Sequence, residues 1–230
     1  MRHLSFPTDE IVGTLDWLDS WDDEVGPVLA TGVVEVPDDV EVDLSVHRVQ
    51  SVERDPFSGG GFITNRITEE GEVVTEQTSG QGWVLSGGSG PPLHLGFLRE
   101  LPADSMTSLS MSGSSTVLAE SLSALPHLAL GLKRLYLGRT DFGDNVLQYV
   151  ALLENLTYLQ TWGNRFTDHG VKQLASLQAL ETLYLEEENL SPAAFDFVTE
   201  LPNLTRLGVA DEWPAEYLSA LRRIFPDVVR

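Results

Sequence analysis

The sequence predicts an α/β protein in which a wall of parallel strands is backed by helices and preceded by a β-rich unit. From residue 97 onward, leucines return with a period of about 24 residues, and apolar residues at helical spacing follow each of them. Residues 1–95 lack this period and alternate apolar with polar residues, as half-buried strands do. We therefore expect two domains, a β-rich unit over residues 1–95 and a repeat domain over residues 96–230.

Several segments of the N-terminal half are expected to be strands. Residues 10–18 form one, and residues 26–49 alternate on both sides of Pro37-Asp38-Asp39, a turn sequence that should join two more. FITNRI and GEVVTEQ flank the breaker-rich residues 68–71 and should form a hairpin. Glycines and proline in residues 86–92 mark the junction to the repeats. We expect this unit to cap the repeat array, because an uncovered first repeat would leave its leucines in water.

Each repeat carries three apolar positions, the first, fourth and sixth, that are expected to point inward. The first positions are numbered 106, 132, 156, 180 and 204, and the same period leads on to Val228. One strand–helix unit cannot bury both of its faces, so stacked units should share these side chains as a core. The triplets are Met106-Leu109-Met111, Leu132-Leu135-Leu137, Leu156-Leu159-Thr161, Leu180-Leu183-Leu185 and Leu204-Leu207-Val209.

A helix is expected to return the chain after each strand. Val171, Leu174 and Leu177 have helical spacing, and their equivalents recur one period before and one period after them. Thr167-Asp168 and Ser191-Pro192 have the composition of helix starts. The last segment, AEYLSALRRIFPDVVR, should form a closing helix. Tyr217, Leu218, Leu221 and Phe225 can lie on one face of it.

Residues 97–230 resemble the leucine-rich repeat family, in the helix-containing subtype found in bacterial proteins and ubiquitin-ligase adaptors. LTYLQTWGNRFTDHGVKQLASL, residues 156–177, carries the family's leucines, its asparagine and its T-D-x-G turn within one unit. The resemblance implies a right-handed strand–helix leucine-rich-repeat solenoid of about five short repeats, with an N-terminal β-rich capping unit. Asparagine at position nine occurs only at Asn164, so the hydroxyl of Thr140 or backbone bonds should hold the other turns.

The composition excludes several functional classes. The chain of 230 residues has 35 acidic and 14 basic side chains, a formal net charge of −21 that disfavours binding to nucleic acids through their phosphates. It contains no cysteine, which rules out disulfides, thiol nucleophiles and thiolate metal sites. No apolar run has the length of a signal peptide or a membrane-spanning helix, so we expect a cytoplasmic protein without membrane contact. The charge reflects composition alone, forms an acidic face that would attract a basic partner, or is an adaptation to high salt.

Motifs for catalysis, metals or cofactors are missing from the sequence. There is no HExxH, no G-x-S-x-G and no glycine loop leading into G-K-[ST]. We therefore expect neither an enzyme nor a bound cofactor. Glu186-Glu187-Glu188 could bind a cation or a basic partner, but such a run is also typical of a solvated turn. Arg139 and Arg165 in the adjacent units could neutralise part of its charge.

The variable positions of the strands point to a binding surface. Positions three, five and seven project from the strand wall and combine aromatic with charged side chains, as interface hot spots do. Aromatic residues also favour strands, so the same pattern is compatible with plain sheet cover. The candidate partner-binding residues are Arg134, Tyr136, Tyr158, Gln160, Trp162, Tyr184, Glu186 and Arg206.

The sequence favours a non-catalytic interaction module that binds a protein or peptide on the concave strand face of the repeats. The alternative is a small-ligand or enzymatic site in the N-terminal β unit, with the repeats as a targeting arm. Trp17, Trp21 and Trp83, together with the acidic residues 16–24, would line that pocket.

Overall fold

The computed structural model describes most of the residues of the chain. The described residues are 1–17, 28–47, 49–54, 62–67, 73–79, 83–87, 92–112, 117–187, 190–210, 213–225 and 228–229. The strands are β1 (Arg2–Ser5), β2 (Gly13–Asp16), β3 (Val28–Leu29), β4 (Val33–Val36), β5 (Asp43–Val46), β6 (Val49–Arg54), β7 (Phe62–Ile67), β8 (Val73–Ser79), β9 (Trp83–Gly87), β10 (Ser108–Ser112), β11 (Arg134–Gly138), β12 (Tyr158–Trp162), β13 (Thr182–Glu186), β14 (Arg206–Val209) and β15 (Val228–Val229). The helices are η1 (Leu95–Glu100), η2 (Ala119–Leu128), η3 (Asp144–Val146), α1 (Leu147–Val150), η4 (Val171–Ser176), η5 (Pro192–Glu200) and α2 (Ala215–Ile224).

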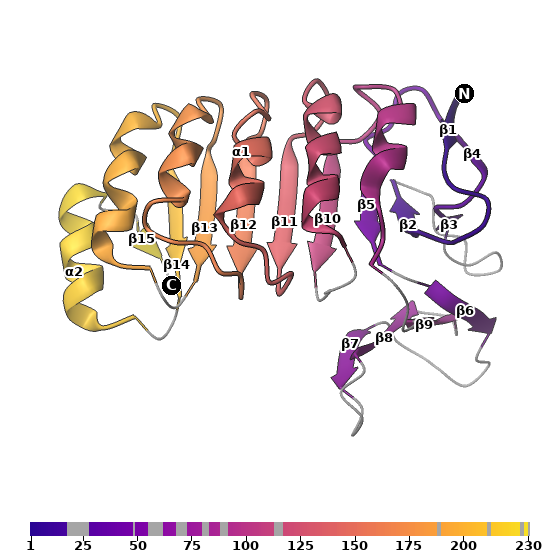
Figure 1. The fold of residues 1–230 in the computed structure, drawn as a ribbon, viewed down its shortest axis with the longest axis horizontal. Coiled ribbons are helices and arrows are strands. Elements are labelled where there is room, and N and C mark those ends of the chain that lie inside the picture. The colour runs from indigo at the N-terminus through magenta and orange to yellow at the C-terminus, as the bar shows by residue number, and fades with distance from the viewer. Residues whose placement is uncertain are drawn as a thin grey trace.

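The predicted mixed α/β fold with a parallel-strand sheet and short helices is confirmed. Within the described residues, one sheet has the strand order β15-β14-β13-β12-β11-β10-β5-β2-β3. The strands from β5 to β15 run parallel, and the helices line up along one side of them (Figure 1). From β11 to β14, residues one period apart in sequence are register partners: Arg134 pairs with Tyr158, Tyr158 with Thr182 and Thr182 with Arg206. The sequence period is therefore the step from one strand to the next.

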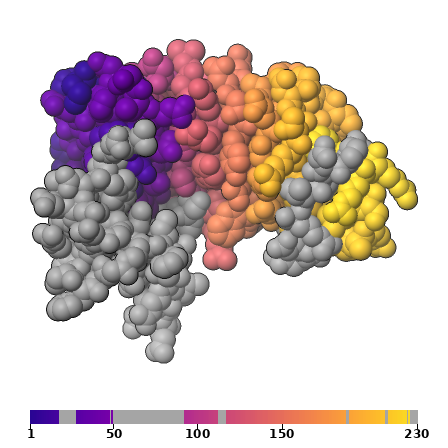
Figure 2. Space-filling view, turned by 180° about the vertical axis from the view of Figure 1, so that it is seen from behind, coloured from indigo at the N-terminus to yellow at the C-terminus, as the bar shows by residue number. Residues whose placement is uncertain are grey.

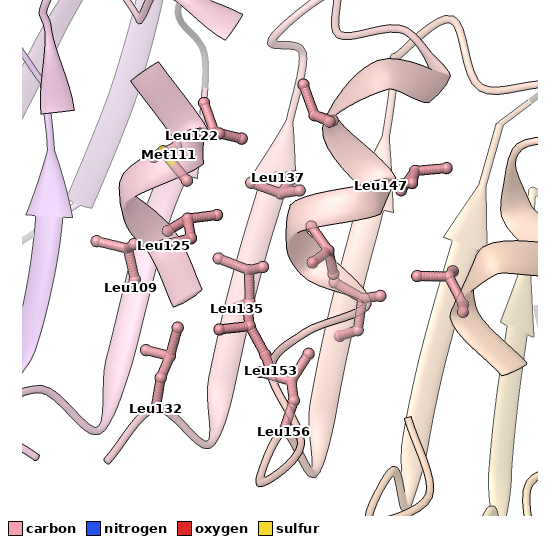
Figure 3. Close-up of a cluster of buried hydrophobic side chains, with 14 of the residues drawn as sticks. Leu109, Met111, Leu122, Leu125, Leu132, Leu135, Leu137, Leu147, Leu153 and Leu156 are labelled. Carbon is pink, nitrogen blue, oxygen red and sulfur yellow. The ribbon is translucent and has the colours of Figure 1, made fainter. Parts of the chain in front are cut away.

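The core lies between this sheet and the row of helices. The first, fourth and sixth positions of the repeats point toward the helices, as Leu135 and Leu137 do in Figure 3, and these side chains are buried. Leu147 and Leu153 cover them from the helix side. Burial of such side chains stabilises a fold by about 1.5–3 kcal/mol each, which makes this layer the main source of stability.

The returning helices are shorter and tighter than the sequence suggests. Most of them are 3₁₀ helices, and within the described residues only α1 and α2 are α-helical. A 3₁₀ helix rises about 2.0 Å per residue against about 1.5 Å in an α-helix. A short 3₁₀ segment therefore matches the length of a strand with fewer residues, and the short sequence period can still close each unit. The predicted start at Ser191-Pro192 is confirmed, with Ser191 extended at the N-cap and Pro192 opening η5.

The N-terminal half is β-rich, as predicted, but its strands belong to three sheets. β5 pairs in parallel with β10 and antiparallel with β2, so these N-terminal strands extend the large sheet. β1 and β4 form an antiparallel ribbon. The predicted hairpin is confirmed as β7 and β8 in a sheet with the order β6-β9-β8-β7, although the connecting residues 68–72 lie outside the described part.

The turn at Pro37-Asp38-Asp39 joins two strands that do not pair with each other. β4 ends just before it and pairs with β1, whereas β5 follows it and pairs with β2 and β10. Alternation in the sequence identifies a half-buried strand, but the partner of that strand depends on contacts that are distant in sequence.

Candidate functional site

The candidate surface is the side of the large sheet that faces away from the helices, here called the strand face. Because successive side chains of a strand point to opposite sides, burial of Leu135, Leu159 and Leu183 in the core sends their neighbours outward. Figure 2 views the molecule from this side. The strand face comprises Arg134, Tyr136, Tyr158, Gln160, Trp162, Thr182, Tyr184, Glu186, Arg206 and the glycines 138 and 208.

Three tyrosines of the predicted site form a continuous row of rings across three strands. The ring centroids of Tyr136 and Tyr158 lie 5.0 Å apart, and those of Tyr158 and Tyr184 lie 5.9 Å apart. Both distances fall within the range that aromatic pairs favour, and the ring planes are tilted by 40° and 42°. The hydroxyl of Tyr158 donates a hydrogen bond to Oε1 of Gln160 at 3.1 Å, which fixes both polar ends. The row is half-buried and offers apolar area beside a few oriented polar groups.

Two other aromatic contacts depend on glycines of the neighbouring strands. Trp162 is the register partner of Gly138, and a Cβ on that glycine would lie 2.2 Å from the indole Nε1. Tyr184 is the register partner of Gly208, where a Cβ would lie 2.0 Å from the ring. Each ring therefore occupies the space that a side chain on the next strand would fill. The two glycines leave room for these rings over the neighbouring strands, so the strand face presents apolar ring surface at both positions.

The arginines of the predicted site differ in what they contact. Arg134 pairs with Asp43 of β5 at 3.1 Å and with Glu41 at 3.3 Å. Burial alone would lower the pKa of Arg134, but the two carboxylates outweigh it and raise that pKa above its usual value. Burial raises the pKa of Asp43 despite the arginine beside it. Arg206 is exposed, and its guanidinium lies over the ring of Tyr184 at 5.7 Å from the centroid. Arg134 thus ties β11 to the N-terminal strands, while Arg206 faces outward.

The run of glutamates is divided between two environments. Glu186 is half-buried on the strand face, where it is the register partner of Trp162. Glu187 is only 1% exposed, so it is not part of a solvated turn. One of its oxygens accepts the backbone N–H of Asn164 at 2.7 Å, and the other accepts the Asn164 amide Nδ2 at 3.1 Å. Glu188 lies outside the described residues.

Asn164 joins three consecutive strand turns through buried hydrogen bonds. Besides contacting Glu187, its amide Nδ2 donates to the carbonyl of Leu137 at 2.9 Å. The hydroxyl of Thr140 donates to Oδ1 of Asn164 at 2.6 Å, which confirms the predicted role of Thr140 in holding its turn. Asn164 therefore fixes the C-terminal ends of β11, β12 and β13 relative to one another.

Tyr158 provides an electrostatic signature of the site. Burial raises its pKa to about 12, and the neighbouring Tyr136, Tyr184 and Glu186 add to the effect. The folded protein thus retains the phenolic proton above pH 10, where the same group in the unfolded chain has lost it. The stability that Tyr158 contributes is complete below about pH 10 and is lost as the pH rises toward about 12.

We expect Tyr158→Phe to reduce the loss of stability at alkaline pH. Urea denaturation at intervals between about pH 8 and pH 11.5 should show a free energy of unfolding that falls more steeply for the wild type than for the variant. At neutral pH the two proteins should differ little, because the phenol is protonated in both states. Parallel curves over the whole range would contradict the assigned environment.

Sequence reasoning missed Arg139 as part of this surface. Its guanidinium lies over the ring of Trp162 at 4.7 Å from the centroid, rather than against the glutamates as the sequence suggested. Arg165, the other arginine expected near those glutamates, pairs with Asp141 at 2.7 Å. The sequence period could have singled out Arg139, because an arginine stands there where the next unit has a glycine, Gly163.

The alternative tryptophan-lined pocket falls mostly outside the described residues. Trp17 is half-buried against the core, while Trp21 and the side chain of Trp83 are not described. Across the described part, no three histidine, aspartate or glutamate side chains are grouped closely enough to hold a metal ion. None of the described helices is long and apolar enough to cross a membrane.

Comparison with protein-family models gives no match for this chain, and comparison with curated proteins gives none either. Its function is therefore inferred from the surface itself.

Proposed function

We propose that the chain is a non-catalytic protein-interaction module that binds a protein or peptide partner on its strand face, in the cytoplasm. The observation that carries this proposal is the group of half-buried aromatic rings on the strand face. Tyr136, Tyr158 and Tyr184 form its row of rings, and Trp162 extends it toward the ends of the strands. Rigid aromatic side chains flanked by arginines are the residues that dominate binding energy in protein interfaces.

We also propose that the repeat domain is a right-handed leucine-rich-repeat solenoid of about five short repeats. Parallel pairing at a constant offset of one sequence period supports it, as do the buried leucines and the helix after each strand. The general rule that crossovers between parallel strands are right-handed supports the hand. In such an array the strand side is the extended surface on which partners bind.

The geometry suggests why this face would be selective. Arg134 is anchored by Asp43 and Glu41, and the tyrosine row is fixed by the Tyr158–Gln160 hydrogen bond. A surface ordered before binding loses little conformational entropy when the partner arrives. Site-specific photo-cross-linking tests the proposal, with the partner expected to be trapped from Thr182 in the middle of the strand face.

A further inference from the structure

Two arginines of the strand face lie on aromatic rings instead of against carboxylates. Arg139 lies over Trp162 and Arg206 over Tyr184. Within the described part of the chain, neither arginine has a carboxylate partner, whereas Arg134 and Arg165 both do. A guanidinium stacked on a ring keeps its N–H groups available at the edge of its plane. The rings thus position both side chains, and guanidinium N–H groups remain available for a partner.

Arg139 occupies a backbone conformation that favours glycine. Its φ is +50°, and one period later Gly163 fills the equivalent position with a φ of +66°. A non-glycine residue in this left-handed region costs about 1 kcal/mol or more. Folding alone would be served better by glycine at position 139. An arginine kept there despite the strain points to a role outside folding.

The local charge of the strand face differs from that of the whole chain. The protein carries a formal net charge of −21, yet among the described residues of the strand face Arg139 and Arg206 are not paired with a carboxylate, and Glu186 is the one described carboxylate on the outer side of β11 to β14. A basic partner drawn by the net charge would meet like charges at these two points. Carboxylates would instead form charge-assisted and bidentate hydrogen bonds with the guanidinium groups.

The spacing of the two arginines suits an extended chain. Arg206 is three strands from β11, and Arg139 lies five positions beyond the register row that Arg206 shares with Arg134. With about 4.8 Å between strands and about 3.3 Å per residue, the two backbone positions are roughly 22 Å apart on a diagonal. An extended peptide covers that distance in about six or seven residues. The diagonal crosses β12 between Gln160 and Trp162 and β13 at Tyr184, where apolar side chains of such a peptide would lie.

From these observations we propose that the strand face binds an extended acidic segment of a partner protein, with two carboxylates held by Arg139 and Arg206 and apolar residues between them. This inference rests on the proposed function, because it names the partner chemistry of the same surface. It replaces the basic partner that net charge alone would suggest.

Selection of random twelve-residue peptides displayed on phage against the full chain tests this proposal. Enriched peptides are expected to carry acidic residues about six or seven positions apart, with aliphatic or aromatic residues between them. Dissociation constants of the best synthetic peptide would then be measured for the wild type, Arg139→Gln, Arg206→Gln and Arg99→Gln. The last variant removes the same charge from η1, where Arg99 contacts Ser123 on the helix side.

We expect each strand-face substitution to weaken binding about tenfold and Arg99→Gln to change it less than about twofold. Arg139→Gly should weaken binding as Arg139→Gln does while leaving the melting temperature equal to or above that of the wild type, because the left-handed turn suits glycine. If Arg139 had only a structural role, Arg139→Gly would lower the melting temperature and leave binding unchanged.

Three outcomes would overturn the proposal. If the enriched peptides lose binding to Trp162→Ala/Tyr184→Ala but lack acidic residues, the acidic segment is wrong and the proposed function stands. If the peptides bind that variant and the wild type equally tightly, the acidic segment and the proposed function are both wrong for this surface. If no peptide is enriched, the extended segment is wrong, while cross-linking from Thr182 still decides the proposed function.

Discussion

Replacing Asn164 by alanine is expected to destabilise the protein by about 4 kcal/mol, because several buried polar groups lose their partners together. The substitution removes the contacts to the hydroxyl of Thr140, the carbonyl of Leu137 and one oxygen of Glu187. Each buried group left without a hydrogen bond costs about 1–3 kcal/mol. Glu187 would be affected most, since its carboxylate is 1% exposed and, among the described residues, would keep the backbone N–H of residue 164 as its one hydrogen-bond donor.

Asn155→Ala is the matched control for this prediction. Asn155 is exposed and donates to the carbonyl of Ala129, so its loss should cost less than about 1 kcal/mol. Urea denaturation of the three proteins at neutral pH would give the difference in free energy of unfolding. Equal costs for the two asparagines would show that the Thr140–Asn164–Glu187 network does not hold the strand turns together.

Trp162→Ala combined with Tyr184→Ala is expected to reduce partner binding by more than about 100-fold, since single hot-spot residues commonly contribute about 2 kcal/mol or more. The substitutions remove the rings that cover Gly138 and Gly208 and release the guanidinium groups of Arg139 and Arg206. The melting temperature should fall by only a few degrees, because both rings lie on the outer side of the sheet and not in the core.

Affinity capture from a lysate of the source cells, followed by mass spectrometry, would measure this effect. Tyr217→Ala is the control, since Tyr217 is a partly exposed aromatic residue on α2 that contacts Trp213. A protein retained by the wild type and by Tyr217→Ala but not by the double variant is the expected result. Unfolding of the double variant would instead show that these rings support the sheet.

The positions of the strand-face tyrosines could be predicted from sequence because they depend on two periods alone. The repeat period places Tyr136, Tyr158 and Tyr184 on consecutive strands, and the alternation within a strand sends them away from the buried leucines. The tilt of the rings could not be predicted in the same way. It depends on the residue that each neighbouring strand presents, which is Gln160 beside Tyr136, Thr182 beside Tyr158 and Gly208 beside Tyr184.

Two other features could not be predicted, because an alignment of the repeats assumes that residues at the same repeat position have the same surroundings. Glu187 falls at a position that is free to vary, yet the asparagine of the preceding turn draws it into a buried hydrogen-bond pair. β5 reads as a half-buried strand in sequence, but its pairing with β10 joins Asp43 to Ser108, which are distant in the chain. Contacts between non-equivalent residues decide both cases.

Photo-cross-linking from two positions tests the central claim, that the strand face is where a partner binds. A photoreactive amino acid would replace Thr182, which lies between Tyr158 and Arg206 in the register of the sheet, and in a second protein Lys172, which is exposed on η4. The strand-face proposal predicts a cross-linked protein from position 182 that is absent from position 172 and is lost in the Trp162→Ala/Tyr184→Ala background. A partner trapped from position 172 and not from position 182 would place binding on the helix side and contradict it.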